Sequence, residues 1–203
     1  EAPWEEKLIC GGTVRHEGGG YRRWYQSYGR RTSLNLCATS ADGIAWQRPV
    51  LGQYPDFEGN LENNIFLNRL AFRSADRAPF HRTQDHNPNV LYTPHQGPER
   101  TYTLLSYEYA RSGYADYDGY FPAYSSDGIT WTDGPEHAVI PGHADVGWFT
   151  YDELDRVYRG VVKTYLIIRG FHRRSVLATR SADGLEWTLP HPTFVPDLED
   201  EAW

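Results

Sequence analysis

The sequence contains no methionine and only two cysteines, Cys10 and Cys37, among its 203 residues. Two cysteines are too few for a disulfide framework. Both lie in strand-like apolar runs, so we interpret them as small buried hydrophobic residues. A bridge between them is the alternative that an exported protein would permit. Without an initiating methionine the chain reads as processed or trimmed, and the sequence leaves its compartment open.

Long apolar runs and blocks of positive charge are also missing. No stretch of apolar residues is long enough to span a bilayer, which predicts no membrane helix. The formal net charge is −7 and the arginines are scattered, so the chain lacks the basic patch that nucleic-acid binding requires. No segment carries a capped, amphipathic helical pattern. The 13 prolines and 19 glycines instead suit many short strands, and we expect an all-β protein.

Aromatic residues are abundant, with 15 tyrosines and 7 tryptophans. Aromatic side chains favour strands, and most of these rings are expected in the core. Flat rings also cover the apolar faces of sugars, so the same composition suits a carbohydrate site.

An internal repeat is the main signal. The motif Ser-x-Asp-Gly-x-x-Trp occurs three times, at residues 40–46, 125–131 and 181–187. Gly accepts a positive φ and Asp bonds its own backbone, so each copy predicts a tight turn between strands. The Ser hydroxyl ties the turn, and the Trp ring packs back on the hairpin. We therefore interpret the motif aspartates as structural and not catalytic.

A second pattern precedes each turn motif. Two β-rich runs separated by a polar turn occur at residues 13–28, 89–109 and 148–165. Together with the hairpin, each unit would form a four-stranded antiparallel sheet, which is the repeat of a β-propeller. The expected single domain, residues 1–203, divides into blades at about 5–49, 85–134 and 145–190, an insertion at 52–84, and the start of a further blade at 191–203.

The chain contains about three to four blades, and three cannot close a propeller, since closed ones have at least four. An open edge would invite pairing with another strand. Either the chain is part of a longer protein, or another copy or another chain completes its ring.

The sequence resembles family 32 glycoside hydrolases and their five-bladed relatives, of the fructosidase and arabinosidase type. The resemblance rests on the turn motif, on WYQ after a Gly-rich turn, and on four segments in a fixed order. These segments are CATSADGIAWQRP (37–49), LENNI (61–65), DHNPNVLY (85–92) and DVGWFTYDEL (145–154). It implies a site in a central funnel, with carboxylates on the innermost strands of successive blades. Glycoside cleavage needs a proton donor and a carboxylate on the opposite face of the sugar.

The resemblance implies two inward carboxylates, Asp85 and Asp145, because each opens the inner strand of a blade. Glu62 is a third, weaker candidate. The alternative for Asp85 and Asp145 is a turn-capping role. The first blade departs from the family, which has Asn-Asp-Pro-Asn-Gly where this chain has Ile9-Cys10-Gly11-Gly12. No carboxylate stands at that nucleophile position, and the general acid is not identified.

The expected substrate-binding residues are His86, Asn87, Glu108, Trp148 and Arg169. Arg169 has an ordinary role in a solvated hairpin as its alternative, and Glu108 could be an outward strand residue. No histidine or cysteine spacing matches a metal signature, so we expect no metal and no cofactor.

The leading hypothesis is cleavage of a glycosidic bond in a furanoside or related glycan. A propeller that binds a glycan or a protein without catalysis is the alternative, as is a different enzyme activity on the same scaffold.

Overall fold

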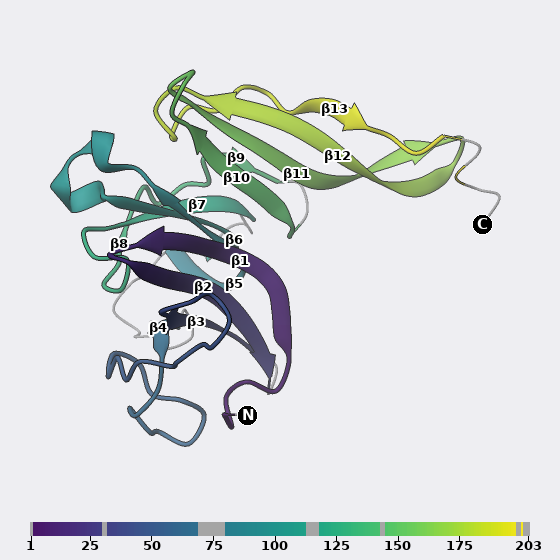
Figure 1. Cartoon of the computed structure of the whole chain (residues 1–203). Coiled ribbons are helices and arrows are strands. Elements are labelled where there is room, and N and C mark those ends of the chain that lie inside the picture. The colour runs from purple at the N-terminus through teal and green to yellow at the C-terminus, as the bar shows by residue number, and fades with distance from the viewer. Residues whose placement is uncertain are drawn as a thin grey trace.

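The computed structural model describes residues 2–29, 32–68, 80–112, 118–142, 145–197 and 200. Regular structure in these ranges is almost entirely β, in three antiparallel sheets (Figure 1). The helical segments that the structure describes are two single 3₁₀ turns, η1 (Pro94–Gln96) and η2 (Pro98–Arg100). Neither they nor any other described helix could cross a membrane. The all-β prediction is confirmed.

The first sheet has the order β1-β2-β3-β4. Its strands are β1 (Leu8–Glu17), β2 (Gly20–Gly29), β3 (Thr32–Ser40) and β4 (Ile65–Leu67). Gly18 and Gly19 form the β1–β2 turn with positive φ angles of 59° and 81°, which residues other than Gly rarely adopt. The chain therefore runs outward strand by strand, as in a propeller blade.

The second sheet repeats this order. Its strands are β5 (Phe80–Tyr92), β6 (Tyr102–Ser112), β7 (Gly119–Ser125), β8 (Thr132–Asp133) and β9 (Ile140–Pro141). The two short strands β8 and β9 both pair with β7, at different points along it. They share the outermost position, so this sheet too is four strands deep.

The third sheet has the order β10-β11-β12-β13. Its strands are β10 (Gly147–Asp152), β11 (Val157–Ile168), β12 (Phe171–Ser181) and β13 (His191–Phe194). β11 and β12 continue past Gly147, the first residue of β10, as a long hairpin, which projects away from the other two sheets (Figure 1).

The outer strands differ from the expected blade limits. β4 lies inside the segment expected as an insertion, and β13 pairs with β12 where a new blade was expected to start. The motif turn explains both differences, since the chain after it forms only single bridges, Thr39–Gln47 and Ser181–Trp187, in the first and third sheets. A later, short segment takes the outermost position instead.

The three motif turns have the expected internal bonds. Asp42, Asp127 and Asp183 each accept 2.8 Å hydrogen bonds from the backbone N–H groups two and three residues ahead. The Ser hydroxyl oxygen accepts the Gly N–H at 2.8–2.9 Å in every copy. The structural interpretation of these aspartates is confirmed.

The motif tryptophans pack in two ways. Trp187 folds back on its own turn, where its Nε1 donates to the carbonyl of Gly184 at 3.0 Å. Trp131 instead packs against Phe66 of the first sheet, with ring centroids 6.0 Å apart. The motif therefore ties a blade together in one copy and joins neighbouring blades in another.

Apolar clusters lie between neighbouring sheets. Trp24, Leu104 and Ala123 belong to the cluster between the first and second sheets, and Cys37, a free thiol, is buried in it. Burial raises the pKa of the Cys37 thiol to about 12, which agrees with its interpretation as a small core residue. The side chain of Cys10 lies outside the described residues.

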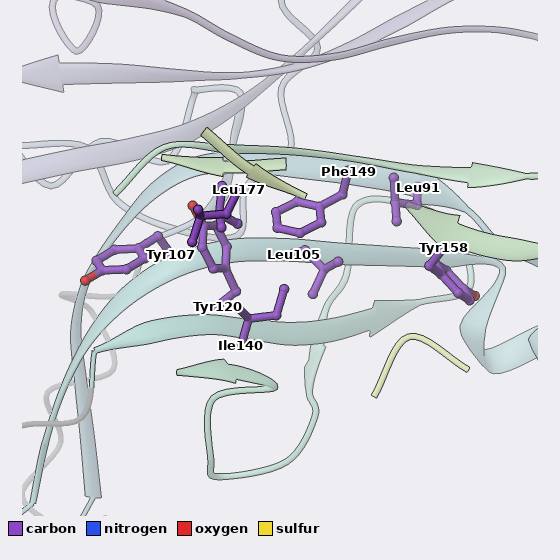
Figure 2. Close-up of a cluster of buried hydrophobic side chains, with 9 residues drawn as sticks. Leu91, Leu105, Tyr107, Tyr120, Ile140, Phe149, Tyr158 and Leu177 are labelled. Carbon is purple, nitrogen blue, oxygen red and sulfur yellow. The ribbon is translucent and has the colours of Figure 1, made fainter. Parts of the chain in front are cut away.

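The cluster between the second and third sheets is drawn in Figure 2. Tyr120 meets Phe149 with ring centroids 5.0 Å apart, and Leu105 and Tyr158 lie in the same cluster. Each large side chain buried in this way stabilises the fold by about 1.5–3 kcal/mol. The sheets are therefore joined face to face, as consecutive blades are.

The innermost strands β1, β5 and β10 lie side by side, with β5 in contact with both of the others. This adjacency creates a centre toward which all three sheets converge. It fixes where a functional cavity between the blades would be expected.

Candidate functional site

A cavity of about 550 Å³ opens where the three innermost strands meet. The first two sheets contribute Gly11, Gln26, Tyr28, His86 and Asn87. Asp145 and Val146 come from the segment before β10, and Trp148 from β10 itself. Four of the residues expected from the sequence are among them, namely Asp145, His86, Asn87 and Trp148. This size and mixture of apolar and polar groups are typical of a small-molecule site.

Asp145 is ion-paired with Lys163 of β11. The Lys163 Nζ donates to Oδ1 of Asp145 at 2.5 Å, and the two side chains are 19% and 37% exposed. Burial opposes ionisation of Asp145, but Lys163 and the nearby His86 hold the pKa of the carboxyl below its usual value. Asp145 is therefore an anion at neutral pH and cannot donate a proton there.

His86 lies between aromatic rings. It stacks on Tyr28 at 6.4 Å and meets Tyr109 edge-on at 5.6 Å, measured between ring centroids. Burial lowers the pKa of His86, against the pull of Asp145. The imidazole is therefore neutral at neutral pH, and can both donate and accept a hydrogen bond.

Asn87 holds the innermost strands together at the cavity wall. Its φ angle is +52°, and the β5 ladder is irregular between His86 and Asn89. The Asn87 side chain donates to the carbonyl of Gly147, and its backbone N–H donates to Gln26 at 3.3 Å. A buried residue whose side chain bonds the third sheet and whose backbone N–H bonds the first fixes the relative position of the two.

At the position on β1 where the family resemblance implies a nucleophile, this chain has glycine and no carboxylate side chain. The β1–β2 ladder is irregular between Ile9 and Gly12, and Gly11 lines the cavity. A Cβ on Gly12, whose φ is +129°, would lie 2.1 Å from the carbonyl oxygen of Trp24. This close approach requires Gly at position 12.

Two other predicted acids lie on β5 and β6. Asp85 is paired with Glu108 in the backbone register, one residue before His86, but its side chain lies outside the described residues. Glu108 is fully buried and accepts a hydrogen bond from Ser106 at 3.1 Å. Glu108 is therefore neither an exposed strand residue nor part of the cavity lining.

The structure does not bring Glu62 or Arg169 to the cavity. Glu62 is exposed just before β4, the outermost strand of its sheet, because this segment completes the sheet edge. Arg169 occupies the β11–β12 turn with a φ of +50°. It lies six residues beyond Lys163, or about 20 Å along an extended strand.

Sequence reasoning missed Lys163, Tyr28 and Gln26. Lys163 could have been found from the register, since the 153–156 turn places it opposite Val146, and its N–H donates to that carbonyl at 2.8 Å. Tyr28 and Gln26 carried no signal beyond their strand. Among the described residues, no three side chains of the His, Cys, Asp or Glu type come together as a metal site.

Fold and site define a class of protein: four-stranded antiparallel blades of a β-propeller, with a polar cavity at their innermost strands. No family model and no curated protein matches the sequence. Solved structures do match the fold; several of them are glycoside hydrolases, and one is an N-acetylgalactosamine deacetylase from F. plautii.

The chain is similar to an exo-inulinase from Aspergillus awamori, at 14% identity and a TM-score of 0.66, over 97% of this chain and 39% of that one. It is similar to a family 32 β-fructofuranosidase of Bombyx mori, at 11% identity and a TM-score of 0.58, over 89% and 34% of the two chains. A family 130 protein that targets β-1,2 mannosidic linkages is 17% identical, with a TM-score of 0.52, over 96% and 54%.

These likenesses establish the fold and confirm the predicted resemblance at that level. The chain spans about two fifths of the inulinase.

Proposed function

We propose that this chain forms part of a glycoside hydrolase site that cleaves a furanoside or related glycan. The observation that supports the proposal best is the cavity at the innermost strands, where an ionised Asp145 and a neutral His86 lie beside the exposed indole of Trp148. A carboxylate that can face the developing positive charge is one of the two groups that glycoside cleavage needs, and an aromatic face suits the apolar side of a sugar ring.

Asp145 would act in its anionic form. A carboxylate that stays ionised can stabilise an oxocarbenium-like transition state or take a proton from an attacking water. It cannot protonate the leaving oxygen, so another group must be the acid. Asp85 is our candidate for that role, from its place on β5 beside His86.

A glycan-binding protein without turnover is the second candidate, and one observation favours it. Gly11 lines the cavity on the first inner strand, so Asp145 is the single carboxylate among the described lining residues. A site with one carboxylate binds a sugar more readily than it hydrolyses one, since both standard mechanisms use a pair.

The test is hydrolysis of inulin, sucrose and β-1,2-mannobiose by the purified chain, with release of monosaccharide measured by chromatography. We expect turnover of at least one probe and a loss of about a hundredfold or more for Asp145→Asn, the usual order for removing a catalytic carboxylate. Asp155→Asn, on the exposed β10–β11 turn, is the matched control and should retain full activity. Binding of a probe without turnover would select the second candidate, and an unaltered rate in Asp145→Asn would remove Asp145 from the mechanism.

A further inference from the structure

A cavity of about 390 Å³ lies between the first and second sheets, toward the C-terminal ends of β1 and β5. It is lined from the first sheet by Arg15, Glu17 and Arg22, and from the second by Tyr92 and Tyr102. The two sheets pack on each other through a shared apolar cluster, so both walls belong to one intact blade interface. None of the described residues that line it also lines the central cavity, so it is a separate site.

The register shows that the next blade interface has an equivalent place. Tyr92 pairs with Tyr102 across β5 and β6, and Tyr151 pairs with Tyr158 across β10 and β11. Tyr102 and Tyr158 each lie opposite the serine of their turn motif. The two tyrosine pairs therefore occupy the same position in consecutive blades, and the space before each pair can be compared directly.

At the interface between the second and third sheets, the chain fills this space itself. The β5–β6 loop, which contains η1 and η2 (Figure 1), places His95 on the Tyr151 ring with centroids 4.1 Å apart. The hydroxyl of Tyr158 lies 3.1 Å from Nε2 of His95 and accepts a hydrogen bond from Gln96 at 2.5 Å. An imidazole and an amide of the preceding blade thus cover both tyrosines.

At the interface between the first and second sheets, the corresponding connection is the Gly18–Gly19 turn, which has no side chain to place there. The Arg15 guanidinium instead lies over the Tyr92 ring, 3.5 Å from its centroid. The Tyr102 hydroxyl donates to Glu17 at 2.7 Å. These two side chains start from the β1 strand itself and leave a cavity where the other interface has a loop.

The charges around this cavity do not balance. Three charged residues line it, two arginines and one glutamate, which leaves one positive charge in excess. Arg22 is already engaged, since its Nε lies 2.8 Å from the Glu17 carboxylate and its Nη1 donates to the carbonyl of Asp127 at 2.5 Å. The Nε of Arg15 is buried and has no hydrogen-bond partner among the described residues, although Glu17 lies 3.5 Å away. A buried donor of this kind is costly unless an acceptor reaches it.

We infer that the cavity between the first and second blades binds a small organic anion, whose carboxylate or phosphate group accepts hydrogen bonds from Arg15. The planar guanidinium group matches both oxyanions. The volume is near the lower end of the range of about 300–1,000 Å³ for small-molecule sites, so the ligand is no larger than about one monosaccharide. This binding function is independent of the proposed cleavage of glycosidic bonds.

The experiment is calorimetric titration of the purified chain with inorganic phosphate, glycerol 3-phosphate and glycerate, and with glycerol as the uncharged control. We expect at least one of the anions to bind, and its comparison with the others distinguishes a phosphate from a carboxylate ligand. Arg15→Ala should lower the affinity about tenfold, the order of one hydrogen bond from a charged donor. Glycerol should not compete with the bound anion.

Two further variants separate binding from a structural role. Glu17→Gln keeps an oxygen for the Tyr102 hydroxyl but removes the competing negative charge, so it should raise the affinity for the anion about threefold. Arg23→Ala is the matched control, because Arg23 lies next to Arg22 on β2 and points to the opposite face of the sheet. It removes the same charge from the chain and should leave the affinity unchanged.

Several results would overturn the inference. The first is that none of the three anions binds. Equal losses of affinity in Arg15→Ala and Arg23→Ala would mean that the anion responds only to the net charge of the chain. Urea denaturation shows whether each variant is folded; if Arg15→Ala is not, Glu17→Gln decides alone, and an unchanged or weaker affinity there would mean that Arg15 and Glu17 only join the two blades.

Discussion

At the scale of single residues, the charge state of Asp145 decides what the site can do. Lys163 approaches it from β11 and His86 from β5, and the phenols of Tyr107, Tyr109 and Tyr120 lie near enough for its charge to raise their pKa values after burial. Lys163 is the strongest of the groups that keep the carboxyl ionised.

Replacing this lysine should raise the pKa of Asp145. In Lys163→Met, burial still raises the pKa of Asp145, but the ammonium group that lowers it is gone. The pKa of Asp145 should therefore be higher than in the wild type. The acid limb of any activity should shift to higher pH with it. Carbon-13 NMR titration of the carboxyl group would measure the change, and an unchanged pKa would refute the pairing.

The stability of the protein should follow the same linkage. Because the folded-state pKa of Asp145 is depressed, its contribution is present above the unfolded-state pKa and disappears as pH falls through the folded-state value. The difference in unfolding free energy between wild type and Lys163→Met should therefore be largest near neutral pH and shrink in acid. A difference independent of pH would contradict this assignment.

The sequence predicted the residues whose role is local, and missed those whose role depends on pairing. The motif aspartates bond their own turn, so four or five residues of sequence were sufficient to interpret them. Lys163 acts on Asp145, 18 residues away, through a strand register. The exposed position of Glu62 before β4 also depends on strand pairing, and nothing in LENNI indicates that the segment leads into the outermost strand.

At the scale of elements, the turn motif makes different contacts in different blades. The second turn docks on the first sheet: Arg22 donates to the carbonyl of Asp127 at 2.5 Å, and the Trp24 indole donates to that of Gly128 at 2.7 Å. Gln96 donates to the carbonyl of Asp183 at 3.1 Å in the third turn. The turn of the first sheet, around Asp42, is exposed.

The same substitution should therefore have unequal effects at equivalent positions. Asp127→Ala removes the acceptor for two backbone N–H groups and disturbs the docked carbonyls, at a cost of about 2 kcal/mol in unfolding free energy. Asp42→Ala removes the same internal bonds in an exposed turn and should cost clearly less. Urea denaturation of both variants makes the comparison, and equal losses would show that docking adds nothing.

Outer strands were the elements that the sequence could not locate. β4 and β13 are three and four residues long, too short for an alternating pattern to stand out. The long strands nearer the centre carry regular aromatic and apolar patterns and were expected close to their observed places. The positions of the outer strands also depend on the turn motif, because the segment that follows the motif was predicted to be a full strand and forms only a single bridge in the first and third sheets.

At the scale of the whole molecule, neighbouring sheets are joined by polar bonds as well as by apolar clusters. Asn89 is buried, and its amide group donates to the carbonyls of Asn87 and Gly147 at 2.7 and 3.1 Å while its carbonyl accepts the N–H of Phe149. Thr13 makes one such bond, to Val90, between the first and second sheets. Both residues therefore set the relative position of the strands that line the cavity.

Asn89→Ala and Thr13→Val form a matched pair of variants that test this joint. Asn89→Ala should lower the unfolding free energy by about 3 kcal/mol, because it leaves several buried backbone groups without their partner, and Thr13→Val by about 1 kcal/mol. Hydrogen exchange should localise each effect: the Phe149 amide should exchange faster in Asn89→Ala alone, and the Val90 amide in Thr13→Val alone. Faster exchange at both amides in either variant would instead mean that the three sheets open as a single unit, and that the joints between blades have no separate stability.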